Sequence, residues 1–443
     1  MSSSVLLRDS QLSDLAQQLA ASSPQLRSAA VAIDCDPLTL VRAGASLFAR
    51  SSFFRTPAGD EVASLGVAQR FGASGLERFA NLEADLAALP DLVGGARLVL
   101  GFSFAPEGPT QPEWAGFGAA DAILPAVTVV RSGDETRLVV AAAPGTDCAA
   151  LLETLAMLVA PEDPPPPDPG VHTVESVPST VPWQSEVSEA VGAIAEGSFE
   201  KVVLARSVHV HSERPTDPFG LVFHLGIANP SCYIYAAVVG ESAFVGASPE
   251  LLLEQHAREI RINPLAGSAR RGKGDDDIEV GRQLLESGKN LGEHAIVVDD
   301  LVLRLSGVTS RLDYPAEPSL RRMATVQHLS TEITGSLLAD VSTFDVLSSI
   351  HPTPAVGGTP RAAALAFIDK AEGIDRGWYA GGVGWIDPQG GAQVALALRC
   401  ALVNGTTSRL YAGNGIVGES DPALELIETR LKFQPLLTLL AAT

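Results

Sequence analysis

The stretch Gly413-Asn-Gly-Ile-Val-Gly-Glu-Ser-Asp-Pro-Ala-Leu-Glu-Leu-Ile-Glu-Thr-Arg-Leu-Lys432 predicts a helix with an unusual distribution of charge. Asp421 suits the N-cap position and Pro422 the first turn. On a helical wheel, Leu424, Ile427 and Leu431 form an apolar stripe. A second stripe, about 80° away, consists of Glu425, Glu428 and Lys432. We expect the apolar stripe to be buried. Because the charged stripe borders it, we expect those charges to line a cleft rather than to face open solvent.

The composition places this helix in a globular protein. The chain has 443 residues, of which 46% are hydrophobic, enough for a large core. Length alone suggests two or three domains, although large single-domain folds reach this size. The N-terminus lacks the pattern of a secretory signal, and the most apolar window, 138–160, is interrupted by polar and turn residues. We therefore expect a soluble cytoplasmic protein with no membrane partner.

Charge and cysteine content narrow the possible partners. The formal net charge is -21, and the longest basic cluster is Arg270-Arg271, so nucleic acid is not expected as a partner. The four cysteines have no paired spacing and predict neither disulfides nor a zinc site. A small anionic ligand would have to be held against the overall field by local cations or a metal ion.

A proline-rich connector spans residues 161–170. Five of its first seven residues are prolines, which have a fixed φ and no amide hydrogen, so it predicts neither helix nor sheet. The motifs with chemical potential follow it. We therefore divide the chain into 1–160, the connector and a catalytic region at 171–443. The connector could mark a domain boundary or cross the surface of one architecture.

Lys201 stands where a predicted helix passes into a predicted strand. Residues 184–196 have helical apolar spacing and end at Gly197, and residues 201–210 are β-branched. An ammonium at the start of an apolar strand would lie near buried surface. Burial lowers the pKa of a lysine, which allows it to act as a base near neutral pH. The alternative is a solvated lysine, which is the commoner environment.

Two turn regions follow. Residues 243–253 read as strand, turn and strand, with Glu250 at the turn. Residues 262–272 read as another turn, in which Gly267 and Ser268 could offer backbone amides to an anion.

A second long helix, predicted over 277–305, carries Glu293 near its middle. Oxygen ligands from Glu293 and Glu428, completed by waters and a substrate carboxylate, would suit Mg²⁺. The alternative interpretation is a salt bridge between Glu428 and Lys432 at i, i+4 spacing. Spacing alone does not separate the two.

Together these residues resemble the chorismate-utilising enzymes, the superfamily of isochorismate, salicylate, anthranilate and aminodeoxychorismate synthases. The resemblance covers about 187–437 and is specific because nine stretches occur in the family's order. They are Lys201-Val-Val-Leu-Ala-Arg206, Gly246-Ala-Ser-Pro-Glu250, Pro264-Leu-Ala-Gly-Ser-Ala-Arg270, Gly292-Glu-His294, Gln327-His-Leu329, His351-Pro-Thr-Pro-Ala-Val-Gly-Gly-Thr-Pro360, Asp375-Arg-Gly-Trp-Tyr379, Leu398-Arg-Cys400 and the C-terminal stretch quoted above. Residues 1–160 resemble the family's more variable part.

Positions that differ within the family indicate an isochorismate synthase. The position of Lys201 resembles one that holds a glutamine in anthranilate synthases, whose nucleophile is ammonia. A lysine at this position suits water as the nucleophile. Aminodeoxychorismate synthases of the familiar type use a nucleophilic lysine where this chain has Ala266. The run His351-Pro-Thr-Pro-Ala is similar to isochorismate synthases, and salicylate synthases usually differ there. The alternatives kept are a salicylate synthase, an ammonia-using synthase and a catalytically silent binding module.

The resemblance implies the chemical roles. Lys201 would act as the base that activates water for attack at C2 of chorismate, and Glu250 would act as the acid for the departing C4 hydroxyl. Mg²⁺ would bind Glu293 and Glu428, with Glu425 holding a metal-bound water. Arg399 would bind the pyruvyl carboxylate.

The remaining substrate-binding residues follow from the same resemblance. Tyr411, Gly415 and Lys432 would complete the wall around Arg399, and His328 would lie near the ring substituents. For His328 and Tyr411, the residues alone favour an ordinary buried role.

The resemblance also implies an α+β fold with a large antiparallel β core and helices packed outside it. It implies a monomer that needs no glutamine amidotransferase, in a pathway to menaquinone or a catecholate siderophore. Three residues depart from the usual pattern. Gly288 and Gly292 replace a frequent glutamate and histidine, and Asn414 replaces an alanine near the substrate wall.

Overall fold

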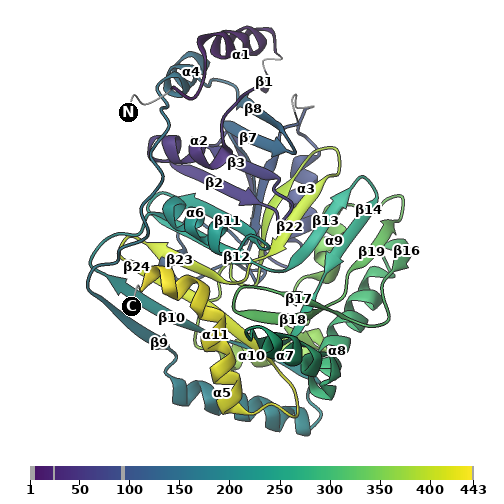
Figure 1. The fold of residues 1–443 in the computed structure, drawn as a ribbon. Helices are drawn as coiled ribbons and strands as arrows, with labels where there is room; N and C mark the ends of the chain where they lie inside the picture. The colour runs from purple at the N-terminus through teal and green to yellow at the C-terminus, as the bar shows by residue number, and fades with distance from the viewer. Residues whose placement is uncertain (1–4, 23–24, 91–94, 442–443) are drawn as a thin grey trace.

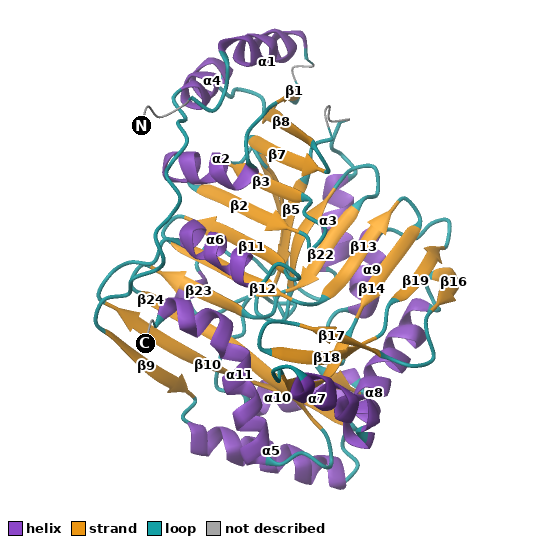
Figure 2. Cartoon of the chain, in the orientation of Figure 1, coloured by secondary structure: helices purple, strands orange, loops and turns teal. Residues whose placement is uncertain are grey.

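The computed structural model describes residues 5–22, 25–90 and 95–441. Its elements form a β core with helices outside it (Figures 1 and 2). The α-helices are α1 Asp9–Ala21, α2 Pro37–Gly44, α3 Arg78–Leu86, α4 Cys148–Ala156, α5 Thr180–Ala195, α6 Pro218–Ala228, α7 Asp275–Glu286, α8 Gly288–Leu305, α9 Thr343–Ile350, α10 Arg361–Ala371 and α11 Pro422–Leu440. Two short 3₁₀ turns are η1 Ala45–Leu47 and η2 Pro112–Trp114.

The largest sheet of the described residues has twelve antiparallel strands and combines both ends of the chain. Its spatial order is β1-β8-β7-β3-β2-β11-β12-β23-β24-β10-β20, with β9 paired to β10. The strands are β1 Arg27–Ala32, β2 Arg50–Arg55, β3 Glu61–Leu65, β7 Val127–Ser132, β8 Glu135–Ala142, β9 His172–Val177, β10 Lys201–Ser212, β11 Tyr233–Val239, β12 Ser242–Ser248, β20 Gly358–Thr359, β23 Cys400–Asn404 and β24 Thr407–Ile416.

Two further antiparallel sheets complete the core. The first has the order β16-β19-β14-β13-β22-β21-β5-β6-β4, and the second β15-β18-β17. Their strands are β4 Gln69–Ala73, β5 Leu98–Phe102, β6 Ala120–Leu124, β13 Leu251–His256, β14 Glu259–Asn263, β15 Leu265–Arg270, β16 Thr309–Asp313, β17 Ser319–Arg322, β18 Val326–Ser330, β19 Ile333–Leu337, β21 Gly382–Ile386 and β22 Ala392–Leu396.

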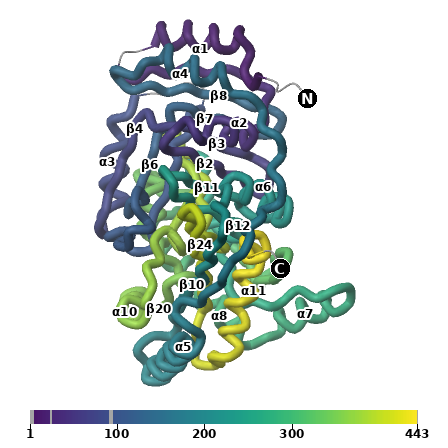
Figure 3. Tube along the Cα trace, turned by 90° about the vertical axis from the view of Figure 1, so that its left-hand side faces the viewer, coloured from purple at the N-terminus to yellow at the C-terminus, as the bar shows by residue number. Residues whose placement is uncertain are grey.

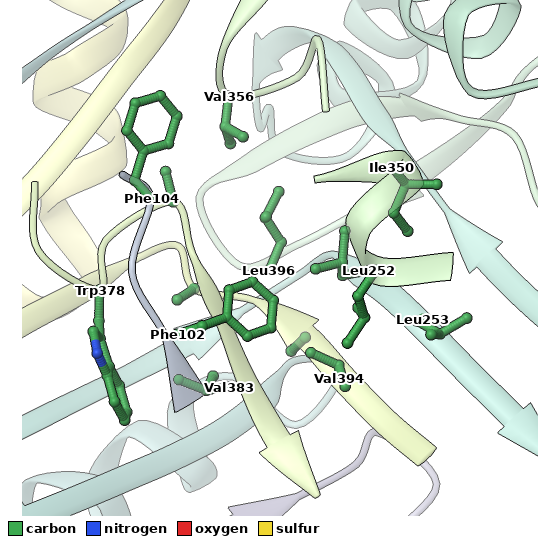
Figure 4. Packing of buried hydrophobic residues seen from close by; sticks show 14 of the residues in the cluster. Phe102, Phe104, Leu252, Leu253, Ile350, Val356, Trp378, Val383, Val394 and Leu396 are labelled. Atoms are coloured by element: carbon green, nitrogen blue, oxygen red, sulfur yellow. The ribbon is translucent and has the colours of Figure 1, made fainter. Parts of the chain in front are cut away.

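Alternation along the strands divides the core into two hydrophobic clusters. In β11, Tyr233 and Tyr235 belong to one cluster, while Ile234 and Ala236 belong to the other. This is the period of two expected when both faces of a sheet are covered. The first cluster lies between the two large sheets, and Figure 4 shows part of it, with Phe102, Val383 and Leu396 among the labelled side chains. The second lies under helices α1, α2, α4, α6 and α11.

The connector at 161–170 contains neither helix nor strand. On both sides of it the chain contributes to the same sheets, because β2 pairs with β11 and β5 pairs with β21. These pairings favour a surface crossing over a boundary between separate domains. The α+β class and the large antiparallel core expected from the resemblance are confirmed.

Three local predictions need correction. The helix expected over 277–305 is two helices, because Ser287 ends α7 and caps α8, so Gly288 begins a helix instead of lying inside one. The turn expected over 262–272 contains strand β15, with a bulge at Gly267. In Figure 3, α7 projects from the side of the molecule.

The third correction concerns α11, whose start at Asp421 is confirmed. Leu424 and Ile427, expected in the core, are 64% and 51% exposed. The buried face instead carries Glu425, Leu426, Thr429, Phe433, Leu436 and Leu440. The helix is therefore turned so that its first carboxylate points into the protein.

Candidate active site

A cavity of about 630 Å³, counted with its open mouth, lies where β10, β24, β15, β18, α8 and α11 meet. Eleven of the twelve predicted site residues line it: Lys201, Glu250, Gly267, Ser268, Glu293, His328, Arg399, Tyr411, Gly415, Glu428 and Lys432. The twelfth, Glu425, lies outside the lining. Residues far apart in sequence thus converge on one site.

Lys201 is the first residue of β10 and is only 1% exposed, so it is not the solvated lysine of the alternative interpretation. Its Nζ lies 3.0 Å from Glu293 Oε1 on α8. Gly415 on β24 provides the space for this pair. A Cβ at position 415 would lie 2.3 Å from Glu293 Oε1 and 2.6 Å from Lys201 Cε.

Glu250 lies in the turn between β12 and β13 and is buried. Burial is the largest influence on its carboxyl group and raises its pKa to about 8. A hydrogen bond from the Leu265 backbone and the charges of Lys201, Arg399 and Lys432 oppose this rise. At neutral pH the carboxyl group is therefore mainly protonated and can donate a proton.

Arg399 lies between β22 and β23 with φ of +50°. A non-glycine residue in this conformation costs about 1–3 kcal/mol, and such residues cluster at functional sites. Its Nη2 lies 3.2 Å from His328 Nε2. Because a guanidinium only donates, His328 Nε2 is the acceptor and the ring proton lies on Nδ1.

The His328 ring continues this chain of contacts. Its Nδ1 lies 3.0 Å from Ser268 Oγ and, as the protonated nitrogen, donates to it. Ser268 in turn hydrogen-bonds the Glu428 carboxylate. Burial, reinforced by the charge of Arg399, holds the pKa of His328 well below its usual value, so the ring is neutral. The chain connects Arg399 to Glu428 through neutral groups.

Glu428 and Lys432 form the predicted i, i+4 ion pair, with Lys432 Nζ 2.7 Å from Glu428 Oε1. Both side chains also line the cavity, so the salt bridge and the cavity-facing interpretations hold together. Burial acts to raise the pKa of Glu428, but the charge and hydrogen bond of Lys432, with the hydrogen bond of Ser268, together lower it below its usual value.

Glu425 lies behind this wall. Its Oε1 is 3.0 Å from Lys289 Nζ on α8, and its Oε2 accepts a hydrogen bond of 2.9 Å from Asn414 Nδ2. Burial and the neighbouring Glu428 raise its pKa. Each of the carboxylates Glu293, Glu425 and Glu428 is therefore paired with a lysine.

Sequence reasoning missed several residues of the site. Lys289 gave no signal, because a lysine on a predicted helix is usually solvated. Ala355 and Val356 lie in the quoted run 351–360 and line the cavity, but apolar side chains carried no chemical clue. Arg376 fastens their loop to β10 by donating to Val356 O and Val203 O, both at 2.8 Å.

Among the described residues, no three His, Cys, Asp or Glu side chains gather closely enough to hold a metal ion by themselves. Two carboxylates facing one cavity, Glu293 and Glu428, still fit Mg²⁺, which uses few protein carboxylates and retains waters. In the described part of the chain, no helix is long and apolar enough to cross a membrane.

Comparison with known proteins identifies the family. The family model described as "Chorismate binding enzyme" matches residues 11–441. The chain belongs to the chorismate-binding enzymes. All residues that line the cavity lie within the matched region. The match confirms the resemblance drawn from the nine sequence stretches.

Individual relatives agree with this membership. The chain is 37% identical over 394 residues to the salicylate biosynthesis isochorismate synthase of Pseudomonas aeruginosa, covering 85% of this chain and 82% of that protein. It is 35% identical over 352 residues to isochorismate synthase MenF of Bacillus subtilis, covering 78% and 75% of the two chains. The structure of MenF, the menaquinone-specific isochorismate synthase from Escherichia coli, superposes with a TM-score of 0.86 at 28% identity, covering 97% and 99%.

Proposed function

We propose that the protein is an isochorismate synthase, which converts chorismate to isochorismate by adding water at C2 and releasing the C4 hydroxyl. One observation carries this proposal: a buried lysine, Lys201, and a buried glutamic acid, Glu250, face the same cavity. A reaction that adds and removes hydroxyl groups needs both a base and an acid. The names of the relatives support the same activity.

Lys201 is the proposed base and Glu250 the proposed acid. Lys201 in its neutral form would take a proton from the attacking water. Glu250, protonated at neutral pH, would give its proton to the departing hydroxyl. Because the reaction only moves a hydroxyl group, we expect it to run in both directions and to depend on a downstream consumer.

The cavity wall would bind the substrate's carboxylates. The planar fork of Arg399 matches a carboxylate, and neutral His328 leaves the positive charge of Arg399 uncompensated. Gly267 and Ser268 would add contacts beside His328, while Tyr411, Gly415 and Lys432 would complete the wall.

Glu293 and Glu428 are the proposed ligands of Mg²⁺, and Glu425 would hold a metal-bound water. Bound Mg²⁺ would supply positive charge to a carboxylate of the substrate. The protein directs two carboxylates into the cavity, and each lies beside a lysine.

A salicylate synthase remains the nearest alternative, since it would add pyruvate elimination to the same first step. An ammonia-using synthase is disfavoured by Lys201, and a silent binding module by the presence of both an acid and a base. The reported relatives are named for salicylate biosynthesis and for menaquinone, so their names do not agree on one pathway. With water as the nucleophile, we expect a monomer without an amidotransferase.

Product analysis tests the proposal directly. Purified protein is incubated with chorismate and Mg²⁺, without ammonia or other enzymes, beside an EDTA control, and the products are separated by chromatography. We expect a mixture of chorismate and isochorismate that requires the metal. Salicylate with pyruvate would indicate the neighbouring activity, and unchanged chorismate would refute the proposal.

Replacement of the base gives a second test. We expect Lys201→Ala to reduce kcat by roughly 10²–10⁴, the usual range for a general base, because the variant lacks the proposed proton acceptor. Binding of chorismate, measured by calorimetry, should change little. Turnover close to that of the native protein would remove Lys201 from this role.

A further inference from the structure

Asn414 connects strand β24 to helix α11 through three hydrogen bonds, and it is only 1% exposed. Its Nδ2 donates to the backbone oxygen of Glu425 at 2.8 Å and to Glu425 Oε2 at 2.9 Å. Its Oδ1 accepts from Lys432 Nζ at 2.8 Å. The nitrogen and the oxygen of one amide therefore both bond to α11, at residues that lie two helical turns apart.

The contact with Lys432 extends to Glu428. Lys432 Nζ donates to Asn414 Oδ1, to Gly413 O at 2.9 Å, and lies 2.7 Å from Glu428 Oε1. An ammonium has three donors, so these acceptors saturate it. The position of the ammonium is set by two oxygens from β24, and the ammonium in turn holds the Glu428 carboxylate.

Few other side chains could make the same set of contacts. The group must donate to a carboxylate at one end and accept from an ammonium at the other, within the reach of a short side chain. Aspartate would place a negative charge against Glu425. Alanine would leave Glu425 Oε1 paired with Lys289 but Oε2 without its amide donor, and would remove one acceptor from Lys432.

We propose that Asn414 is a positioning residue for the metal site, orienting Glu425 directly and Glu428 through Lys432. This inference rests on the proposed function, because it assumes that these carboxylates serve a bound metal. It assigns a role to a position at which the chain departs from the alanine usual in its family. Partners of metal ligands commonly change metal affinity by roughly 10–100-fold when they are removed.

Metal binding measured apart from turnover tests the proposal. Mn²⁺, which substitutes for Mg²⁺ on oxygen ligands, is titrated into the full chain in the presence of chorismate and its free concentration is followed by electron paramagnetic resonance. We expect Asn414→Ala to raise the Kd for Mn²⁺ at least about tenfold. At saturating metal, kcat should recover to within about threefold of the native value, because neither the base nor the acid is altered.

Two further variants separate positioning from packing. Asn414→Leu keeps the branching and the number of heavy atoms of the side chain but not the amide, so it should weaken Mn²⁺ binding as much as Asn414→Ala while filling the space. Asn404→Ala is a matched control, because Asn404 also makes three hydrogen bonds, to Glu113 O, Ser242 Oγ and Arg409, away from the cavity. It should leave the Kd for Mn²⁺ unchanged.

The outcomes are distinct. Normal Mn²⁺ affinity in both position-414 variants, with only a lower unfolding temperature, would overturn the positioning role and leave the isochorismate synthase proposal intact. Restored affinity in Asn414→Leu would show that packing matters and not the amide, which also overturns it. Failure of the native protein to bind Mn²⁺ would remove the metal from the proposed function and the role of Asn414 with it.

Discussion

Glu250 and His328 show how burial sets the protonation of single residues in this site. Both are buried within the cavity wall, and desolvation is the largest influence on each. Burial disfavours the charged form, so it keeps the glutamic acid protonated and the histidine deprotonated. The same cavity thus holds a proton donor and a neutral hydrogen-bonding ring, although three cations act on the donor.

The pKa of Glu250 gives a prediction for pH dependence. Because its carboxyl group has a pKa of about 8, it is protonated below that pH and loses its proton above it. We expect kcat/KM, which reports the free enzyme, to fall about tenfold per unit as pH rises beyond this pKa. Initial rates of isochorismate formation between pH 6 and 10 measure the effect.

The Glu250→Gln variant is the control for this fall in kcat/KM at high pH. It retains the size of the side chain but cannot donate an acidic proton, so its rate should be lower by roughly 10²–10⁴. Its residual rate should no longer fall near pH 8. If kcat/KM of this variant still fell near pH 8, the group that titrates there would not be Glu250.

Gly415 is the residue whose lack of a side chain the site requires. In Gly415→Ala, the new Cβ would lie 2.3 Å from Glu293 Oε1, so Lys201 and Glu293 must move. A displacement of about 1 Å at a reacting group can cost on the order of 100-fold in rate, and we expect a loss of that size in kcat.

Gly418→Ala is the matched control for Gly415. Its Cβ would meet Ile194 at 3.7 Å, an ordinary contact. The rate should therefore stay within about twofold of native. Equal losses in both variants would indicate a general effect on the strand end instead of a clash with the base.

At the residue scale, the polar groups of the cavity were predicted mainly through the resemblance to a family, because the residues alone favoured an ordinary buried role for His328 and Tyr411. Lys201 could be placed at a buried strand start from its apolar neighbours. The pairings could not be predicted: nothing in the local sequence shows that Lys289 faces Glu425 or that Asn414 reaches α11. Such contacts depend on the relative placement of distant elements.

Helix α11 illustrates what periodicity misses at the scale of an element. The helical wheel identified two neighbouring stripes, but we expected the apolar stripe to be buried, whereas the buried face includes Glu425 of the charged stripe. The polar stripe instead meets β24, where Asn414 Nδ2 donates to Glu425 and Gly413 O accepts from Lys432. A buried face can carry charges when each charge finds a partner, and a wheel does not reveal partners.

The break between α7 and α8 has a simple local cause that the periodic pattern concealed. Ser287 accepts a hydrogen bond from Asn290 N as an N-cap, and Gly288 follows it. Apolar spacing continues across the break, so it predicted one long helix. The cap places Lys289 and Glu293 on a helix that starts beside the cavity.

Gly292 allows a prediction about the stability of α8. It lies inside the helix, where glycine costs about 0.5–1 kcal/mol relative to alanine, and a Cβ there would meet no atom within 4 Å. We expect Gly292→Ala to increase the free energy of unfolding by about that amount, measured by urea denaturation.

Gly281 in α7 provides the contrast. A Cβ at this position would lie 2.9 Å from Leu320 Cδ1 and 3.0 Å from Gln327 Oε1. Gly281→Ala should therefore lower the free energy of unfolding despite its better helix propensity. Stabilisation by both substitutions would mean that propensity outweighs packing in this region.

At the scale of the whole molecule, the two parts of the chain share their sheets. Strand β2 lies between β3 and β11, and β5 lies between β6 and β21. The proline-rich connector was readable from the sequence, but these pairings were not, because alternation along a strand does not identify its neighbour. The resemblance to a family supplied the antiparallel core.

This interleaving predicts that residues 171–443 do not fold alone. Without the N-terminal part, β11 and β21 each lose a strand partner and expose an unpaired edge with an apolar face. We expect the isolated fragment to be insoluble or to lack fixed tertiary structure by near-ultraviolet circular dichroism. Coexpression with residues 1–170 should restore a soluble complex, and a soluble, active fragment alone would contradict the shared core.

The pairing of β5 with β21 also has a consequence for how the protein is made. The two strands are separated by about 280 residues of chain, which a ribosome adds at about 5–20 residues per second. The apolar surface of β5 therefore stays without its partner for tens of seconds during synthesis. We therefore expect the nascent N-terminal part to depend on holding chaperones, for a time set by the translation speed of the second half of the message.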